Sequence, residues 1–262
     1  MLTADIDLLS PVNWLAPLNR GLVGWWMAMP GLMSGGGLVD LLGQHIATLT
    51  SGASWSTAAH AGGAGSIALD GTDDHLQTTL GIADTPGITV SAWANLTAAG
   101  NFPQIASYGT NANAVAELRG SGTTGKLSFV NRGNNNGATE ATASNGTGWH
   151  HWIGTGNKVT LTLYKDGVQA ATSATAHSTA GTTVSYRFGR RSDDAFGSFP
   201  FPGYLNDIRI YRGRVLTAFE ARELYLASSQ CYPDELNRVE WLAFPPAAAV
   251  GNPWNYFAQI AG

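Results

Sequence analysis

The sequence predicts an all-β protein built as a two-sheet antiparallel sandwich. Charged residues make up 12% of the chain, against about 25% in an average globular protein, which argues against a long-helix or coiled-coil protein. The chain also has 33 glycines, which suit a fold with many turns. Finally, β-branched, aromatic and aliphatic residues gather in about a dozen short runs separated by Gly and Asn, the pattern of short strands.

The N-terminal residues 1–20 are expected to form an extended arm, because Pro11 and Pro17 interrupt them and they show no sustained hydrophobic period. The strand pattern begins at Gly21, after which the chain is long enough to bury its own core. In the first half of the chain, strands are predicted at residues 21–28, 66–70, 87–94 and 126–130.

The clearest strand begins at Val159, which together with Leu161 and Leu163 alternates with Thr and Tyr residues. This alternation predicts one face on a core and one face in solvent. Asp166 and Gly167 follow, and this pair favours the positive φ angles of a tight hairpin turn, so the next strand should return antiparallel. Further strands are predicted at residues 169–175, 186–189 and 204–211.

One helix is predicted, from Thr217 to about Ala227. Thr217 and Glu220 have the spacing of a capping box, in which each side chain accepts a hydrogen bond from the main-chain amide of the other residue. The residues expected to dock this helix on the sandwich are Phe219, Leu224 and Tyr225.

Residues 229–262 are predicted to form a tail rich in proline and aromatic residues. Leaving a large apolar side chain in water forfeits about 1.5–3 kcal/mol, so these rings are expected to dock. They dock either on their own domain or on a neighbouring subunit, and the sequence leaves both alternatives open. The expected assembly contacts are Trp14, Trp241, Phe244, Trp254, Tyr256 and Phe257.

Charge and hydropathy exclude several classes of partner. The net charge is −4 and no basic run exceeds the pair Arg190-Arg191, so no nucleic acid partner is expected. No stretch approaches the roughly 20 apolar residues of a membrane-spanning helix, so no membrane insertion is expected.

No Lys or Arg precedes Arg20, and we therefore expect no secretory signal. The single cysteine excludes an intrachain disulfide and fits a reducing cytoplasm.

Seven motifs follow one another between residues 21 and 228. They are Gly21-Leu-Val-Gly-Trp-Trp26, Val39-Asp-Leu-Leu-Gly43 with Ala47-Thr-Leu-Thr50, Ala68-Leu-Asp-Gly-Thr-Asp-Asp-His75, Ile88-Thr-Val-Ser-Ala-Trp93, Gly148-Trp-His-His151, Leu163-Tyr-Lys-Asp-Gly167 and Gly203-Tyr-Leu-Asn-Asp-Ile-Arg-Ile-Tyr211. In this order they resemble the laminin-G-like, concanavalin A-like jelly-roll family. The resemblance implies a jelly-roll domain over residues 21–228, between an arm (1–20) and a tail (229–262).

Members of this family include glycan-binding modules, calcium-dependent adhesion domains, some glycoside hydrolases and many bacteriophage surface proteins, and fold alone does not choose among them. The arm and the aromatic tail are similar to those of bacteriophage virion structural proteins. We therefore expect a non-enzymatic capsid decoration, head-fibre or tail-associated protein. It would be made in the host cytoplasm and located in the virion, with other virion or capsid proteins and further copies of itself as partners. The alternative is an independent carbohydrate-binding module or lectin for surface glycans, with calcium as its candidate cofactor.

No catalytic residues are predicted. Hydrolases of this family place several carboxylates at alternating positions of one strand, and the sequence lacks that spacing. His150 and His151 are neighbours on a predicted strand, so they point to opposite faces and cannot chelate one metal together. A packing role is the simpler interpretation of both.

The loop from Arg190 to Pro202 supplies the candidate binding residues. An exposed aromatic platform beside polar groups can bind a sugar, and the residues expected to do so are Arg190, Arg191, Phe196, Phe199 and Phe201. Calcium prefers six to eight oxygen ligands, and the pair Asp193-Asp194 is the first candidate for it. Asp73-Asp74 is a second acidic turn of the same kind. Asp is also an ordinary turn former, which is the alternative interpretation of both pairs.

Overall fold

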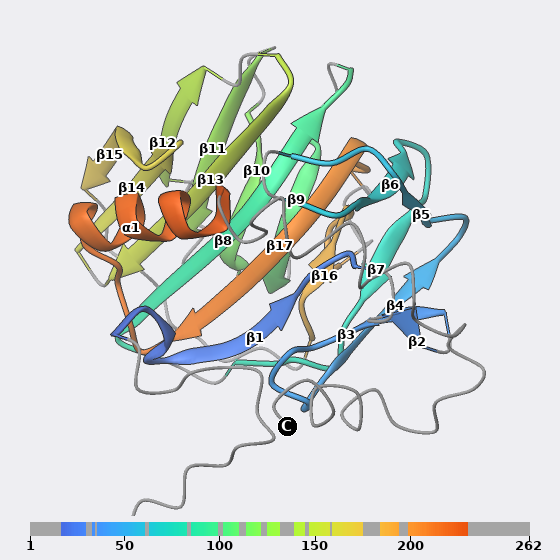
Figure 1. Cartoon of the computed structure of the whole chain (residues 1–262). Coiled ribbons are helices and arrows are strands. Elements are labelled where there is room, and N and C mark those ends of the chain that lie inside the picture. Colours follow the sequence, from blue (N-terminus) through green and yellow to red (C-terminus); the bar gives the residue numbers. More distant parts are fainter. Residues whose placement is uncertain are drawn as a thin grey trace, which may run out of the picture.

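The computed structural model of the chain contains two antiparallel β-sheets packed face to face, with one α-helix on the outer face of the first (Figure 1). The all-β jelly-roll sandwich predicted from the sequence is therefore confirmed. The structure describes residues 17–29, 33–34, 36–60, 63–82, 85–98, 102–109, 114–121, 125–131, 139–144, 147–157, 159–174, 184–193 and 199–229. Several residues singled out from the sequence lie outside this part of the chain: Trp14, Asp194, Phe196, Trp241, Phe244, Trp254, Tyr256 and Phe257.

In the first sheet, called sheet A, strand β17 pairs with three other strands. In spatial order the sheet contains β15 (Val168–Ala174), β14 (Thr160–Lys165), β13 (Trp149–Asn157), β8 (Gly87–Leu96), β17 (Pro202–Arg212), β6 (Ser66–Asp70) and β5 (Ser54–Ser56), and β1 (Leu22–Trp26) also pairs with β17. All of these pairs are antiparallel.

The second sheet, called sheet B, covers the inner face of sheet A. Its order is β12 (Thr139–Ser144), β11 (Lys126–Asn131), β10 (Ala114–Gly120), β9 (Gln104–Gly109), β16 (Arg187–Phe188), β7 (His75–Gln77), β4 (Ile46–Thr50), β3 (Gly37–Val39) and β2 (Met33–Ser34). A short 3-10 helix, η1 (Pro17–Asn19), precedes β1.

The main hydrophobic core lies between the two sheets. Side chains at alternate positions of each strand point into it, as a sandwich requires. Its largest apolar members are fully buried: Trp26, Phe129, Trp152, Phe188 and Phe201.

The hairpin of β14 and β15 confirms the turn predicted from the sequence. Asp166 has a φ of 51° and Gly167 a φ of 74°, so both residues adopt the positive φ that a tight hairpin turn requires. Leu161 and Leu163 are fully buried in the core. Val159, however, lies outside β14 and is 68% exposed, because the strand pairing begins one residue later, at Thr160.

The helix α1 (Ala218–Ser229) begins as predicted. The amide of Glu220 donates to Oγ1 of Thr217 at 3.2 Å, and the amide of Thr217 donates to Oε2 of Glu220 at 2.9 Å. Leu224 is buried and Tyr225 half-buried, as expected, but Phe219 is 72% exposed. The prediction that Phe219 docks on the sandwich was wrong, because it lies on the side of the helix that faces solvent. No helix in the described residues is long and apolar enough to span a membrane.

Candidate functional site

The outer face of sheet A divides into a covered part and an open part. In the covered part, Ala221 and Leu224 of α1 pack on Ile153, Tyr164 and Tyr211 and form a second hydrophobic cluster. Tyr164 is therefore buried, which corrects the expectation from strand alternation that it faces solvent. The helix protects this end of the face from solvent.

A buried polar network continues from this cluster along β17. Asp207 accepts two hydrogen bonds of 2.8 Å from the guanidinium of Arg209 and one of 2.6 Å from Nε1 of Trp25. A bulge in β17 with a φ of 46° at Asp207 places both charged side chains on the outer face. Burial alone would raise the pKa of Asp207, but the charge and hydrogen bonds of Arg209 outweigh burial and hold that pKa below its ordinary value.

Histidine and tryptophan side chains complete the covered part. Nε2 of His151 lies 2.8 Å from Oγ of Ser91, and the rings of His60 and Trp93 stack with their centroids 4.3 Å apart. Burial lowers the pKa of His151 to about 3, despite the opposing charge of Asp207. His151 is therefore neutral at physiological pH and has a packing role, as its sequence context predicted. His150 points the other way and pairs with Asp166 at 2.8 Å.

At the opposite end of the outer face, one row of side chains is open to solvent. The antiparallel register aligns five residues across neighbouring strands, so their side chains project from the same face. Four of them are half-buried and Ser54 is exposed. We call this set the open row: Ser54 of β5, Ala68 of β6, Tyr204 of β17, Asn95 of β8 and Trp149 of β13.

Gly203 determines how closely the strands of the open row approach one another. Its φ is 146°, and a Cβ atom at this position would lie 2.0 Å from the carbonyl oxygen of Asn95. A side chain would therefore force β17 away from β8. Tyr204 follows directly and is aligned with Asn95. The rings of Tyr204 and Trp149 lie 6.3 Å apart.

The open row borders a shallow cavity of about 340 Å³. This volume is near the lower end of the range of small-ligand pockets, about 300–1,000 Å³. Ser54, Ala68 and Tyr204 belong to both the row and the cavity. The remaining polar lining comes from the turn between β4 and β5, from the end of β6, from the turn between β6 and β7 and from the residue that follows β8: Ser51, Asp70, Asp74 and Thr97.

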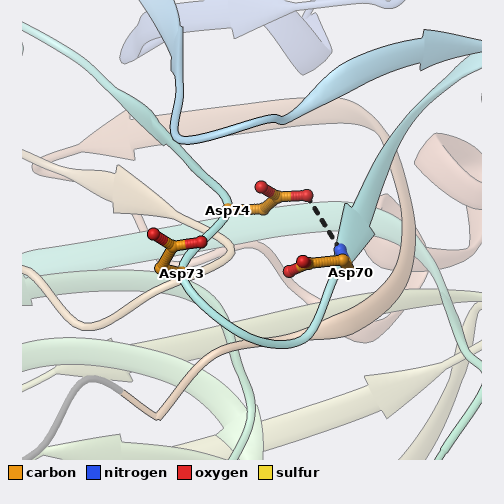
Figure 2. A group of neighbouring side chains, drawn as sticks. All are labelled: Asp70, Asp73 and Asp74. Carbon is orange, nitrogen blue, oxygen red and sulfur yellow. Dashed lines mark hydrogen bonds between the residues drawn. The ribbon is translucent and has the colours of Figure 1, made fainter.

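One wall of the cavity is an acidic turn between β6 and β7, made by Asp70, Asp73 and Asp74 (Figure 2). Oδ2 of Asp74 accepts a hydrogen bond of 2.9 Å from the amide of Asp70, and Oδ1 of Asp70 accepts one of 2.7 Å from the amide of Thr72. Burial raises the pKa of Asp74, and the charges of Asp70 and Asp73 raise it further. The carboxylates of the three residues gather around one small space in Figure 2.

The loop predicted to bind sugar has a different place in the structure. Phe201 is fully buried in the core and Arg191 is 2% exposed, so neither side chain is available to a glycan, which corrects the expectation for both. Nε of Arg191 lies 3.5 Å from the buried carboxylate of Glu117, and its guanidinium lies over the half-buried ring of Phe199. Apolar contact and charge pairing hold these residues inside the protein.

Two further residues of this loop are partly exposed. Arg190 is half-buried, and its guanidinium reaches the carbonyl oxygen of Asp73 at 3.4 Å. Asp193 is half-buried and belongs to no group of three potential metal ligands among the described residues, whereas Asp73 and Asp74 do. The expected calcium ligands Asp193 and Asp194 stay a prediction, since Asp194 lies outside the described residues.

Sequence reasoning missed the open row. Strand alternation in residues 204–211 could have placed Tyr204 on the face opposite Leu205, which is buried in the core. It could not have aligned Tyr204 with Asn95 and Trp149, because the pattern within one strand does not determine its register with the neighbouring strands.

A family model described as the concanavalin A-like lectin/glucanases superfamily matches residues 70–222. The chain belongs to this superfamily. No curated protein sequence matches the chain, so the comparison with solved structures supplies the remaining relationships.

Several solved structures share the fold of this superfamily member. Domain 4 of AbnA, a GH43 extracellular arabinanase from Geobacillus stearothermophilus in complex with arabinotriose, is 16% identical with a TM-score of 0.63, covering 78% of this chain and 98% of that domain. The receptor binding domain of botulinum neurotoxin C/D mosaic serotype is 13% identical with a TM-score of 0.58, covering 80% and 52%. The binding domain of Paraclostridial Mosquitocidal Protein 1 is 14% identical with a TM-score of 0.59, covering 79% and 52%. The chain thus spans about half of each toxin domain.

Proposed function

We propose that the chain is a non-catalytic glycan-binding module whose binding surface is the open row and the adjoining cavity. The observation that carries the proposal is the alignment of Tyr204, Asn95 and Trp149 at the open end of the outer face of sheet A. In this arrangement two aromatic rings flank an amide beside a cavity with hydroxyl and carboxylate groups.

This combination of groups suits a sugar. A pyranose or furanose ring has an apolar face of C–H groups and a rim of hydroxyls. The half-buried rings of Tyr204 and Trp149 offer apolar surface to the C–H face. The amide of Asn95 can both donate and accept hydrogen bonds, while Ser54 and Thr97 supply hydroxyls that do the same. A few polar groups beside an apolar surface are the usual composition of a ligand pocket.

The charge of the cavity favours a neutral glycan. Asp70 and Asp74 line it, and Asp73 lies in the same turn. A sialic acid carboxylate in this cavity would be repelled by these like charges. We therefore assign neutral oligosaccharides as the ligand class.

Two of the related structures support a carbohydrate ligand. Domain 4 of AbnA is a domain in complex with arabinotriose, and cell entry of botulinum neurotoxin type C depends on interaction with two ganglioside molecules. Both proteins share the fold with this chain at low sequence identity. They therefore support a glycan as the class of ligand, and the kind of glycan is argued from the residues of this chain.

The acidic turn favours binding over glycoside hydrolysis. A glycosidase needs two carboxylates that flank the scissile bond, about 5–10 Å apart, one of them acting as an acid. Asp70, Asp73 and Asp74 come from one turn of five residues, so they approach a ligand from one side.

The proposal is tested by titrating the full chain with arabinotriose, with other neutral oligosaccharides and with sialylated oligosaccharides of matched size. Neutral ligands are expected to bind, and sialylated ones at least tenfold more weakly. Trp149→Ala should weaken the binding of neutral ligands at least tenfold, because it removes one of the two rings. Failure of every neutral oligosaccharide to bind, or preferential binding of sialylated ones, contradicts the proposal.

A second candidate function is an assembly role in a bacteriophage virion, as capsid decoration, head-fibre or tail-associated subunit. It is supported by the sequence beyond α1, where residues 230–262 contain Trp241, Phe244, Trp254, Tyr256 and Phe257. A segment with this many aromatic residues is typical of one that docks on a partner. In this role the partners are virion or capsid proteins and further copies of the chain, and the open row would face outward from the particle.

The second function is tested by the solution mass of the full chain and of a chain ending at Ser229, measured by size exclusion with light scattering. An oligomer that becomes a folded monomer on truncation supports assembly through the tail. If both chains are monomers, the tail does not drive self-association, and that part of the second candidate fails.

A further inference from the structure

We infer that Asp70, Asp73 and Asp74 form a binding site for one Ca²⁺ ion at the turn between β6 and β7. The ion would lie beside the proposed glycan-binding surface, because Asp70 and Asp74 line the same cavity, but its binding is tested without a glycan. The negative charges of the three carboxylates outnumber the two positive charges of Ca²⁺, so the preference for neutral glycans is expected with the ion bound as well. It rests on three observations: the spacing of the carboxylate oxygens, a buried oxygen without a hydrogen bond, and the space left by a glycine.

The carboxylate spacing matches the size of calcium. Each of the three residues offers an oxygen, and these oxygens all lie within 4.8 Å of one another. Calcium binds oxygen at about 2.3–2.6 Å, so two oxygens on one ion can be at most about 4.6–5.2 Å apart. The three carboxylates can therefore contact a single ion with little movement of the turn.

The buried carboxylate of Asp74 indicates that a ligand belongs there. Asp74 is 5% exposed. Its Oδ2 accepts the amide of Asp70, but its Oδ1 is buried and has no hydrogen-bond partner. A buried carboxylate oxygen without a partner is costly, and a bound cation would satisfy it.

The turn between β4 and β5 leaves room beside this oxygen. A Cβ atom at Gly52 would lie 2.8 Å from Oδ1 of Asp74, so any other residue would crowd the oxygen. Gly52 and Asp74 line the same cavity. Water and further oxygen ligands can reach the ion from this cavity, as calcium requires with its six to eight ligands.

The local charge also favours a cation. Among the described residues, no Lys or Arg forms an ion pair with the three carboxylates. Arg190 and His75 approach the turn at its main chain, where both contact the carbonyl oxygen of Asp73. Three carboxylates without a neutralising side chain repel one another, and Ca²⁺ removes that repulsion. Mg²⁺ fits less well, because it requires near-ideal octahedral geometry and oxygen ligands at about 2.0–2.1 Å.

The test is calorimetric titration of Ca²⁺ into the full chain after treatment with a chelator and dialysis. We expect one ion per chain, with a dissociation constant in the range of about 10⁻⁴–10⁻³ M that is typical of extracellular calcium modules. Asp73→Asn is the decisive variant. Its side chain is exposed and makes no hydrogen bond among the described residues, so the fold should not depend on it. The matched control is Glu223→Gln, which removes one negative charge from the half-buried Glu223 on α1.

Asp73→Asn should weaken Ca²⁺ binding at least tenfold, whereas Glu223→Gln should bind as the unmodified chain does. The inference is overturned by unchanged Ca²⁺ affinity in Asp73→Asn. It is also overturned if Ca²⁺ gives no binding up to about 10 mM, beyond the weakest sites of this class, or if Mg²⁺ binds more tightly than Ca²⁺. Because no glycan is present, each of these results is separate from the outcome of the oligosaccharide titration.

Discussion

The rings of Tyr204 and Trp149 lie 6.3 Å apart, centroid to centroid, although their strands are separated by β8. Adjacent strands are about 4.7–4.9 Å apart, so strands on either side of a third are about 9.5 Å apart. The two rings therefore lean toward one another over Asn95, which is aligned with both. This close pair of rings is the centre of the proposed glycan-binding surface.

The end of α1 depends on one hydrogen bond to sheet A. Nε1 of Trp93 donates to Oγ of Ser228 at 2.9 Å, and both groups are buried. Ser228→Ala leaves this indole N–H without an acceptor, so we expect a loss of about 1–3 kcal/mol in the free energy of unfolding. Ser229→Ala is the matched control, because its hydroxyl is half-buried and bonds the helix main chain. It should cost less than about 0.5 kcal/mol. If urea denaturation shows that Ser228→Ala and Ser229→Ala lose the same free energy of unfolding, the stabilising role of the bond between Trp93 and Ser228 is contradicted.

His151 should make the protein less stable as the pH falls. Burial lowers its pKa in the folded chain to about 3, whereas the ordinary pKa of histidine is 6.5. Between these pH values the unfolded state binds the extra proton, so the free energy of unfolding decreases as the pH falls below 6.5. The limiting slope is about 1.4 kcal/mol per pH unit. Ser91, His60, Trp93, Tyr225 and the Asp207–Arg209 pair face this imidazole.

The measurement for His151 is urea denaturation at pH values from 7 to 5, above the ordinary pKa of carboxyl groups. His151→Gln should remove much of the dependence on pH in this range, whatever its effect on stability at pH 7. A slope that is the same in the variant and in the unmodified chain would show that His151 is not responsible.

The Asp207–Arg209 pair should be important for folding rather than for binding. Asp207 is 1% exposed and Arg209 4% exposed. Asp207→Asn leaves the guanidinium buried with no opposite charge, for which we expect a loss of about 3–5 kcal/mol. The control is Asp73→Asn in the presence of a chelator, since Asp73 is exposed. Thermal unfolding that is equally affected by both substitutions would contradict this role.

Local features were predictable from the sequence. The capping box of Thr217 with Glu220 and the turn at Asp166-Gly167 both formed as expected, because each depends on residues within four positions of one another. The sandwich itself followed from strand alternation and from the order of the motifs. Those features need no information about which strands become neighbours.

Features that depend on tertiary neighbours were not predictable. Phe201 and Arg191 looked like surface residues in a polar loop, but the core and Glu117 bury them. Tyr204, Asn95 and Trp149 come together because β17, β8 and β13 pair in one register. The sequence identified the acidic pair Asp73-Asp74, but only the folded turn shows that the carboxylate of Asp70 lies close to both.

The central claim is that the open row binds a neutral glycan, and Tyr204 tests it most directly. The measurement is calorimetric titration of the best neutral oligosaccharide into the full chain and three variants, each checked for folding by thermal unfolding. Tyr204→Ala should weaken binding at least tenfold, or about 1.4 kcal/mol. Tyr204→Phe should retain most of the affinity because it keeps the ring, and Phe219→Ala, which removes an exposed ring on α1, should change nothing. Unchanged affinity in a folded Tyr204→Ala variant would contradict the account.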